Sequence, residues 1–418
     1  MRIYFAGLGG VGIGPLAEIA LDAGYDVVGS DLKKSLMSTE LEHRGVQVHL
    51  GEQTGEFLQN EHAKSPFDWF VYTAALPEDH SELVTAHNLG IPTAKRDEFL
   101  AHVIQQKDLK LLAISGTHGK TTTTGMMVWT FKTLGIPVSY SIGTTISFGS
   151  SGAYDPASEY FVYECDEFDR NMLHFQPYLS VITSLDYDHP DTYPTKADYT
   201  SAFSQFLKQS QHTIGWKADL ENLDDASTWQ LEDNEVAKIA LPGEHNRRNA
   251  TLVQKAFEYL QLGDATNALN DFPGTNRRFE KLGDNLYSDY GHHPVEIAAT
   301  LQMARELSEH VVLVYQPHQN IRQHEIREDY TDCMRLADEV YWLPTYLSRE
   351  NPNLAVLTPE QLAENLANKD SVHFAELNVG LWTEMQRHRD VGNLVLCMGA
   401  GSIDEWVRSM LIKDSTIR

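Results

Sequence analysis

A glycine-rich turn with a lysine and two threonines has the residue types of a phosphate-binding loop. Residues 115–122 read Ser-Gly-Thr-His-Gly-Lys-Thr-Thr, between an apolar run and a helix-length segment. Backbone N–H groups of such a turn at a helix N-terminus form an anion cradle. The lysine reaches the β- and γ-phosphates of a nucleotide, and the following threonine supplies a hydroxyl for Mg²⁺. Although the general pattern has another glycine where this chain has Ile114, we predict an ATP site formed by Gly116, Thr117, His118, Gly119, Lys120, Thr121 and Thr122.

A second glycine motif lies near the N-terminus, after the apolar residues 3–6. It reads Gly-Leu-Gly-Gly-Val-Gly over 7–12, and Asp31 ends the next expected strand. A glycine loop with an acidic residue about 20 positions on is typical of dinucleotide-binding domains. The loop is a diphosphate cradle, however, and does not identify the nucleotide. An NAD-dependent oxidoreductase therefore stays open as an alternative; the candidate binding residues are Gly9, Gly10, Val11, Gly12 and Asp31.

Glu164 and His189 are candidate metal ligands because each follows an expected strand. Those strands, near 160–165 and 179–185, continue the sheet that begins at 109–115. Ligand sites collect outside the carboxyl ends of parallel strands, which is also where the loop with Thr121 lies. Magnesium takes oxygen ligands around bound phosphates. A lone Glu or His is usually a solvated surface residue, but here both converge on a phosphate loop, which favours a metal site of Thr121, Glu164 and His189.

The elements that position these residues follow the βαβ rhythm of parallel sheets. Further strands are expected at 26–30, 68–74, 311–316, 339–343 and 393–398, with helices near 14–24 and 120–134. Residues 217–237 are acidic and resemble a surface loop or weak hairpin. We predict an α/β protein of three domains, with boundaries that give 1–107, 108–272 and 273–418.

Composition excludes several classes of partner. The chain has 418 residues, and 33 Lys+Arg against 59 Asp+Glu give a net charge of −26, which repels nucleic acid and anionic membranes. Three cysteines without metal-binding spacing argue against disulfides and zinc. No window reaches the ~18 apolar residues of a membrane span, and glycines and Glu18 interrupt the apolar start that a signal peptide needs. We expect a cytoplasmic protein, a monomer or homodimer.

The loop at 116–122 resembles the nucleotide loop of the Mur ligase family, and further blocks along nearly the whole chain are similar to that family. They are the acidic motif 164–169, the histidine segment 186–193, the Gly-x-His-Asn-x-x-Asn motif 243–249, the arginine motif 274–280, and the segments 289–294, 315–318 and 398–401. The resemblance implies a Rossmann-like N-terminal domain, a P-loop ATPase-like central domain, shortened between His189 and His245, and a Rossmann-like C-terminal domain.

The same resemblance implies a role for each matched residue. Thr121 and Glu164 would bind one Mg²⁺, and His189 would help to bind a second. Lys120 and Arg278 would act on the γ-phosphate. Asn249 would bind adenine and Asp289 the ribose region. The loop at 9–12 and Asp31 would bind a UDP-sugar. His292 and Arg322 are the candidates for the amino-acid side.

The activity implied by the resemblance is ATP-dependent ligation of L-alanine to the lactyl carboxylate of UDP-N-acetylmuramate, through an acyl phosphate, in peptidoglycan precursor synthesis. An alternative within the family is a muropeptide-recycling ligase that adds a peptide to the same nucleotide sugar. One residue departs from the family pattern: Gln319 stands where the alanine-adding branch has an arginine near the amino-acid carboxylate.

Overall fold

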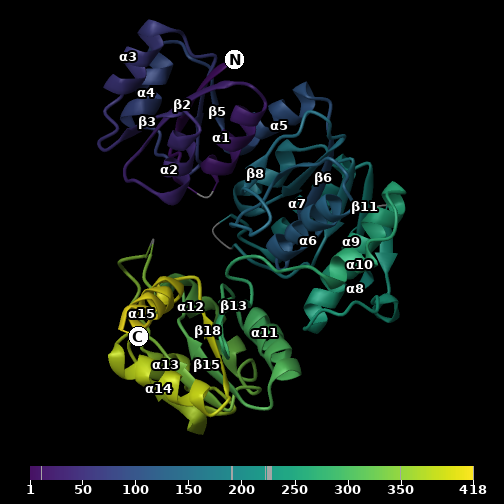
Figure 1. Ribbon diagram of the computed structural model, residues 1–418, viewed down its shortest axis with the longest axis vertical. Coiled ribbons are helices and arrows are strands. Elements are labelled where there is room, and N and C mark those ends of the chain that lie inside the picture. The colour runs from purple at the N-terminus through teal and green to yellow at the C-terminus, as the bar shows by residue number, and fades with distance from the viewer. Residues whose placement is uncertain (11, 190–191, 222, 224–227, 349, 418) are drawn as a thin grey trace. The chain divides into compact units, whose positions relative to one another are not determined.

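The computed structural model describes residues 1–10, 12–189, 192–221, 223, 228–348 and 350–417. The described strands form three sheets, coloured from purple through teal to yellow along the chain in Figure 1. The chain divides into two compact units. The first contains Met1–Ile239 and Asn249–Pro273, and the second contains Ala240–Arg248 and Gly274–Arg418.

The first sheet is parallel and has the strand order β3-β2-β1-β4-β5. All residues of Ile3–Ala6 in β1 are fully buried, as expected for a central strand that helices cover on both faces. The strands are β1 (Arg2–Ala6), β2 (Asp26–Asp31), β3 (Gln47–Leu50), β4 (Trp69–Tyr72) and β5 (Thr93–Lys95). They alternate with α1 (Ile13–Asp22), α2 (Leu36–His43), α3 (Glu56–Lys64), α4 (Ser81–Asn88) and α5 (Arg96–Gln106).

The second sheet has the order β12-β11-β10-β6-β9-β7-β8 and is parallel except for the β7–β8 pair. Its strands are β6 (Lys110–Ser115), β7 (Ser139–Ser141), β8 (Gly152–Ala153), β9 (Tyr160–Glu164), β10 (Leu179–Ile182), β11 (His212–Trp216) and β12 (Thr228–Leu231). The helices are α6 (Lys120–Thr133), α7 (Lys196–Gln209), α8 (Lys217–Leu220), α9 (Glu244–Leu260) and α10 (Thr266–Asn270), with the short helices η1 (Phe168–His174) and η2 (Asp233–Glu235). Because β6 pairs with both β9 and β10, the loops that follow these strands meet at one sheet edge.

The third sheet belongs to the second unit and has the order β13-β14-β18-β15-β16-β17, with only β13–β14 antiparallel. Its strands are β13 (Glu280–Gly283), β14 (Leu286–Asp289), β15 (Val311–Tyr315), β16 (Glu339–Trp342), β17 (Val372–Phe374) and β18 (Leu394–Met398). The helices are α11 (Pro294–Leu307), α12 (Asn320–Ile326), α13 (Pro359–Leu362), α14 (Val379–Asp390) and α15 (Ile403–Ile417), with η3 (Arg327–Tyr330) and η4 (Lys369–Ser371). The central strands β15 and β18 are buried along their whole length.

Every strand and helix named from the sequence is present, with ends that differ by a few residues. The expectation of a loop or hairpin at 217–237 was wrong, because β12 pairs in parallel with β11 and extends the second sheet. The predicted boundaries near 107 and 273 fall between α5 and β6 and between α10 and β13; they stay predictions. Within the described residues, no helix is long and apolar enough to cross a membrane.

Candidate nucleotide and metal site

The loop at 116–119 connects β6 to α6 and depends on two glycines with positive φ. Gly116 has φ 130° and Gly119 has φ 83°, a backbone region that side chains with a Cβ disfavour. A Cβ on Gly116 would also lie 2.5 Å from the Thr183 hydroxyl. These two glycines are therefore required by local geometry, and the helix begins directly after them at Lys120.

Residues after β10 fix the backbone of this loop. The Thr117 amide donates to the Ser184 carbonyl at 3.0 Å, and the His118 amide donates to the Ser184 hydroxyl at 2.9 Å. The Thr117 hydroxyl lies 2.7 Å from the Asp186 carbonyl oxygen and 2.7 Å from the Tyr199 hydroxyl. Since the first N–H groups of α6 have no partner within the helix, the loop and the helix start are arranged to receive an anion.

Lys120 has a side chain that is 15% exposed, and it pairs with a buried carboxylate. Its Nζ donates to Glu167 Oε2 at 2.7 Å and to the Gly116 carbonyl at 2.6 Å. Burial raises the pKa of Glu167 to about 7, against the opposing effect of Lys120. Burial acts to lower the pKa of Lys120, but Glu167 and Asp166 outweigh it and the net shift is upward. The ammonium group therefore stays charged at the phosphate loop.

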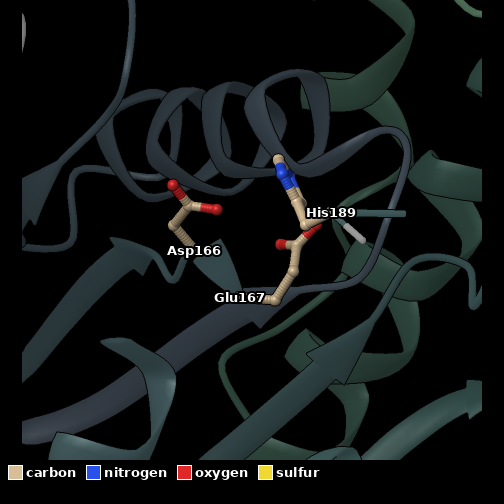
Figure 2. A group of neighbouring side chains, drawn as sticks. All are labelled: Asp166, Glu167 and His189. Carbon is tan, nitrogen blue, oxygen red and sulfur yellow. Dashed lines mark ion pairs between the residues drawn. The ribbon is translucent and has the colours of Figure 1, made fainter. Parts of the chain in front are cut away.

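Asp166, Glu167 and His189 converge beside this lysine (Figure 2). Each offers one ligand atom, and these atoms lie within 4.8 Å of one another. His189 Nε2 is 3.8 Å from Glu167 Oε1, a buried oxygen with no hydrogen-bond partner among the described residues. Two carboxylates and an imidazole next to a phosphate loop fit a hard divalent cation such as Mg²⁺.

The other two predicted metal ligands contact each other. The Thr121 hydroxyl donates to Glu164 Oε1 at 2.7 Å, and Glu164 Oε2 accepts from the Gly143 amide at 2.8 Å. The sequence prediction named Glu164 and His189 but missed Asp166 and Glu167, which lie in the same acidic motif. Three acidic residues within four positions after a strand was the signal that could have identified them.

Asn249 lies next to the phosphate loop. It is 6% exposed, and a Cβ on Gly119 would be 3.0 Å from its side-chain amide. Its segment divides between the two units: Glu244–Arg248 of α9 belong to the second unit, while Asn249 and the rest of the helix belong to the first. The predicted adenine residue is thus beside the loop in the first unit.

In the N-terminal glycine loop, Asp31 holds the backbone. Its Oδ2 accepts from the Gly9 amide at 2.7 Å, and its Oδ1 accepts from the Lys33 amide at 3.2 Å. A Cβ on Gly9 would lie 2.6 Å from the Ser35 hydroxyl, and Gly10 follows with its amide bonded to Gly7 O. Val11, also predicted for this site, is outside the described residues. Asp31 therefore shapes the loop that was predicted to bind the diphosphate.

In the second unit, the two adjacent arginines have different surroundings. Arg277 lies 3.5 Å from Asp404 Oδ2 and donates to the Gly399 carbonyl at 3.3 Å, so contacts within the second unit hold its guanidinium. The Arg278 guanidinium lies 5.1 Å from the Tyr290 ring centre. Asp289 accepts from the Phe279 and Gly291 amides with separate oxygens, and burial raises its pKa. Arg278 was predicted for the γ-phosphate, and that assignment stays a prediction.

His292 and Arg322, the two candidates for the amino-acid side, contact each other. His292 Nδ1 is 3.2 Å from the Tyr290 carbonyl, and the Arg322 guanidinium donates to His292 Nε2. Burial lowers the pKa of His292 to about 4, which agrees with a neutral ring that accepts from an arginine. Gln319 has φ 60° at the start of α12 and donates to the Ser348 hydroxyl at 3.4 Å.

Family models match the chain in three successive regions. The model described as "Mur ligase family, catalytic domain" matches residues 2–108, the "Mur ligase middle domain" matches 114–233, and the "Mur ligase, glutamate ligase domain" matches 277–401.

Individual relatives match over nearly the full length. The chain is 31% identical to the UDP-N-acetylmuramate–L-alanine ligase of Chlorobium chlorochromatii, covering 96% of this chain and 95% of the relative. It is 28% identical to that of Carboxydothermus hydrogenoformans, covering 97% and 95%. A solved structure, UDP-N-acetylmuramate-alanine ligase from Thermotoga maritima, has a TM-score of 0.78 at 25% identity and covers 100% of both chains. A murein peptide ligase from Psychrobacter arcticus shares the fold, with a TM-score of 0.65 at 22% identity, covering 99% of this chain and 98% of that chain.

Proposed function

The chain belongs to the Mur ligase family, and we propose that it joins L-alanine to the lactyl carboxylate of UDP-N-acetylmuramate in an ATP-dependent reaction of peptidoglycan precursor synthesis. The observation that carries the proposal is the convergence of Lys120, the Thr121–Glu164 pair and the Asp166–Glu167–His189 cluster on one phosphate loop. Full-length relatives named for this activity support the choice of substrates.

The proposed reaction has two steps. The lactyl carboxylate oxygen forms a bond to the γ-phosphorus of ATP, and the bond from that phosphorus to the β–γ bridging oxygen breaks, which releases ADP. The alanine nitrogen then attacks the acyl carbon, the bond from that carbon to the phosphate oxygen breaks, and the amine loses a proton. Lys120 holds phosphate oxygens at the start of α6, and the role of Arg278 in neutralising charge on the γ-phosphoryl group stays a prediction.

We propose Mg²⁺ as the cofactor, with two ions held by two neighbouring sets of residues. Thr121 and Glu164 would hold one ion, and His189 with Asp166 and Glu167 would hold the other. Bound Mg²⁺ supplies positive charge that stabilises phosphoryl transfer. Glu167 would connect Lys120 to the cation site, because one of its oxygens accepts from Nζ and the other faces His189.

In the second unit, we propose that Arg322 binds the amino-acid carboxylate and that His292 orients Arg322. The His292 ring is fixed by the Tyr290 carbonyl on one side and accepts from the guanidinium on the other. The oligomeric state and the cytoplasmic location stay predictions.

The proposal is tested by mixing the protein with UDP-N-acetylmuramate, ATP and Mg²⁺ and adding single amino acids or a tripeptide. We expect phosphate release with L-alanine, matched mole for mole by a product one alanyl residue heavier. Phosphate release with the tripeptide but not with L-alanine would instead identify a muropeptide-recycling ligase. Reduction of NAD without phosphate release would identify an oxidoreductase, which the three Mur ligase matches do not favour.

A further inference from the structure

Lys95, Arg96 and Asp97 form a charged segment at the start of α5 that lies between the N-terminal glycine loop and the acidic motif after β9. Lys95 Nζ lies 3.3 Å from Asp169 Oδ2, just after the acidic cluster. Asp97 accepts a hydrogen bond from the hydroxyl of Tyr163, which precedes Glu164 in β9. Arg96, between them, lies against the N-terminal glycine loop at Gly12.

Asp97 fixes the orientation of the Arg96 guanidinium. Arg96 Nε donates to Asp97 Oδ2 at 3.0 Å, and Nη2 donates to Asp97 Oδ1 at 3.1 Å. Asp97 is 3% exposed, so this two-point pair is shielded from solvent on the carboxylate side. A planar guanidinium held at two nitrogens presents its third nitrogen in one direction.

That third nitrogen, Nη1, faces the glycine loop. A Cβ on Gly12 would lie 2.9 Å from Nη1 and 3.2 Å from Cδ of Arg96. In the part of the chain that the structure describes, the hydrogen bonds of this guanidinium use Nε and Nη2, which leaves Nη1 for another acceptor. The side chain is 27% exposed, so an acceptor can approach from solvent.

We propose that Arg96 binds the diphosphate of the nucleotide sugar through Nη1, with Asp97 and Tyr163 as the residues that position it; the identity of that sugar rests on the proposed function. A chain of net charge −26 repels a diphosphate, so its binding requires local positive charge. The helix start at Gly12 contributes backbone N–H groups, and Arg96 adds a full charge beside them. A side chain at Gly12 would have to displace the guanidinium, because its Cβ would lie 2.9 Å from Nη1.

Calorimetric titration with UDP and with UDP-N-acetylmuramate tests the proposal. We expect Arg96→Gln to weaken both ligands about tenfold to a hundredfold, the effect of losing one charge-assisted hydrogen bond. Arg44→Gln is the matched control, because it removes the same charge from the same domain where Arg44 pairs with Asp22 at the end of α1. It should leave both affinities unchanged.

Unchanged binding of UDP to Arg96→Gln overturns the proposal. Weakened UDP-N-acetylmuramate with unchanged UDP also overturns it, because the contact would then lie on the sugar. ATP binding and thermal unfolding check the fold of the variant. If Arg96→Gln does not fold, Arg96→Met takes its place: it keeps an unbranched side chain but removes the charge and the hydrogen-bond donors, and unchanged UDP affinity in it likewise contradicts the proposal.

Asp97→Asn tests the positioning role. It should raise KM for UDP-N-acetylmuramate several-fold with little change in KM for ATP, whereas an equal rise in both would show a general structural effect and contradict positioning. A wild-type protein that binds UDP but neither binds nor converts UDP-N-acetylmuramate would refute the proposed function; the UDP comparison would still decide the role of Arg96.

Discussion

Lys120 Nζ lies 2.7 Å from Glu167 Oε2, and both groups are largely shielded from solvent beside the phosphate loop. The pair links the residue that follows the glycines to the acidic cluster after β9. Removing either partner leaves the other as a buried charge without its main compensation, which is strongly unfavourable. The loop and the cluster therefore form one site, in which nucleotide and cation binding are expected to depend on each other.

Lys120→Ala should abolish phosphate release while leaving UDP-N-acetylmuramate affinity nearly unchanged. The lysine is at the start of α6, whereas the proposed sugar site is at the loop before α1. Calorimetry with both ligands measures this. Lys110→Ala, which removes an exposed lysine paired with Glu159 from the opposite end of β6, is the control and should retain activity. Equal loss of ATP and UDP-sugar binding in a folded Lys120 variant would contradict two separate sites.

Asp166→Asn, Glu164→Gln and His189→Ala should each raise the Mg²⁺ concentration needed for half-maximal activity by about tenfold or more, as loss of a ligand or its partner does. Titration of activity with MgCl₂ at saturating ATP gives the midpoint. Asp169→Asn is a suitable control, because Asp169 belongs to the same acidic motif but pairs with Lys95 near the surface. Midpoints that do not move in any of the three variants would remove them from the cation site.

Acid should destabilise the second unit through His292. Burial lowers the folded-state pKa of this ring from 6.5 to about 4, with Arg322 and His318 also lowering it and Glu296 opposing. Between these values the unfolded chain binds more protons, so stability rises with pH and is lost as pH falls from 6.5 towards 4. The full contribution of this shift to the free energy of unfolding is about 2–4 kcal/mol.

Urea unfolding of wild type and His292→Gln at several pH values measures this contribution. At pH 7.5 the variant should be less stable, because it lacks the Arg322 and Tyr290 contacts of the ring. The difference in free energy of unfolding between the two proteins should become smaller as pH falls, because only the wild type loses stability when the buried imidazole is protonated. If the free energies of unfolding of the two proteins change in parallel from pH 7.5 to pH 4, His292 is not buried in its neutral form.

Gln319→Arg should lower KM for L-alanine if the amino-acid pocket otherwise follows the family. A guanidinium forms charge-assisted hydrogen bonds to a carboxylate that an amide cannot equal, worth ~1.5–3 kcal/mol. Steady-state kinetics with L-alanine, glycine and L-serine compares the two proteins. Gln319→Lys controls for charge without the two-point geometry. An arginine variant with weaker use of L-alanine would mean that the contact of Gln319 with Ser348 belongs to a rebuilt pocket.

The parts of the site that depend on local geometry could be predicted from the sequence. Gly116 and Gly119 are needed by the backbone wherever that turn occurs, and strand ends placed Glu164 and His189 at the same edge. The run of acidic residues at 164–169 indicated a metal-binding segment, but the sequence could not show which of its carboxylates face the site, because the chain turns sharply there. Asp169 and Arg170 have φ of 52° and 57°, and such consecutive left-handed residues leave no periodic pattern.

Long-range contacts also could not be predicted from the sequence. The sequence analysis named Arg278 for a phosphate and gave no role to Arg277, because the contact of Arg277 with Asp404 involves a helix more than a hundred positions away. Asp31 was predicted to bind substrate, and in the structure it accepts hydrogen bonds from two backbone amides. A carboxylate at a strand end can accept hydrogen bonds from a loop as well as from a ribose, and the sequence does not distinguish the two. Arg96 was missed for a similar reason: its neighbour Gly12 is 84 positions earlier in the chain.

The most direct test of the account follows one oxygen atom. With UDP-N-acetylmuramate labelled with ¹⁸O in both lactyl carboxylate oxygens, ATP, Mg²⁺ and L-alanine, we predict that each released phosphate carries one ¹⁸O, while the amide product retains the other. Mass spectrometry of phosphate and product measures both. Unlabelled phosphate, with both labelled oxygens still on the carboxylate, would contradict activation of that carboxylate at the Lys120 loop.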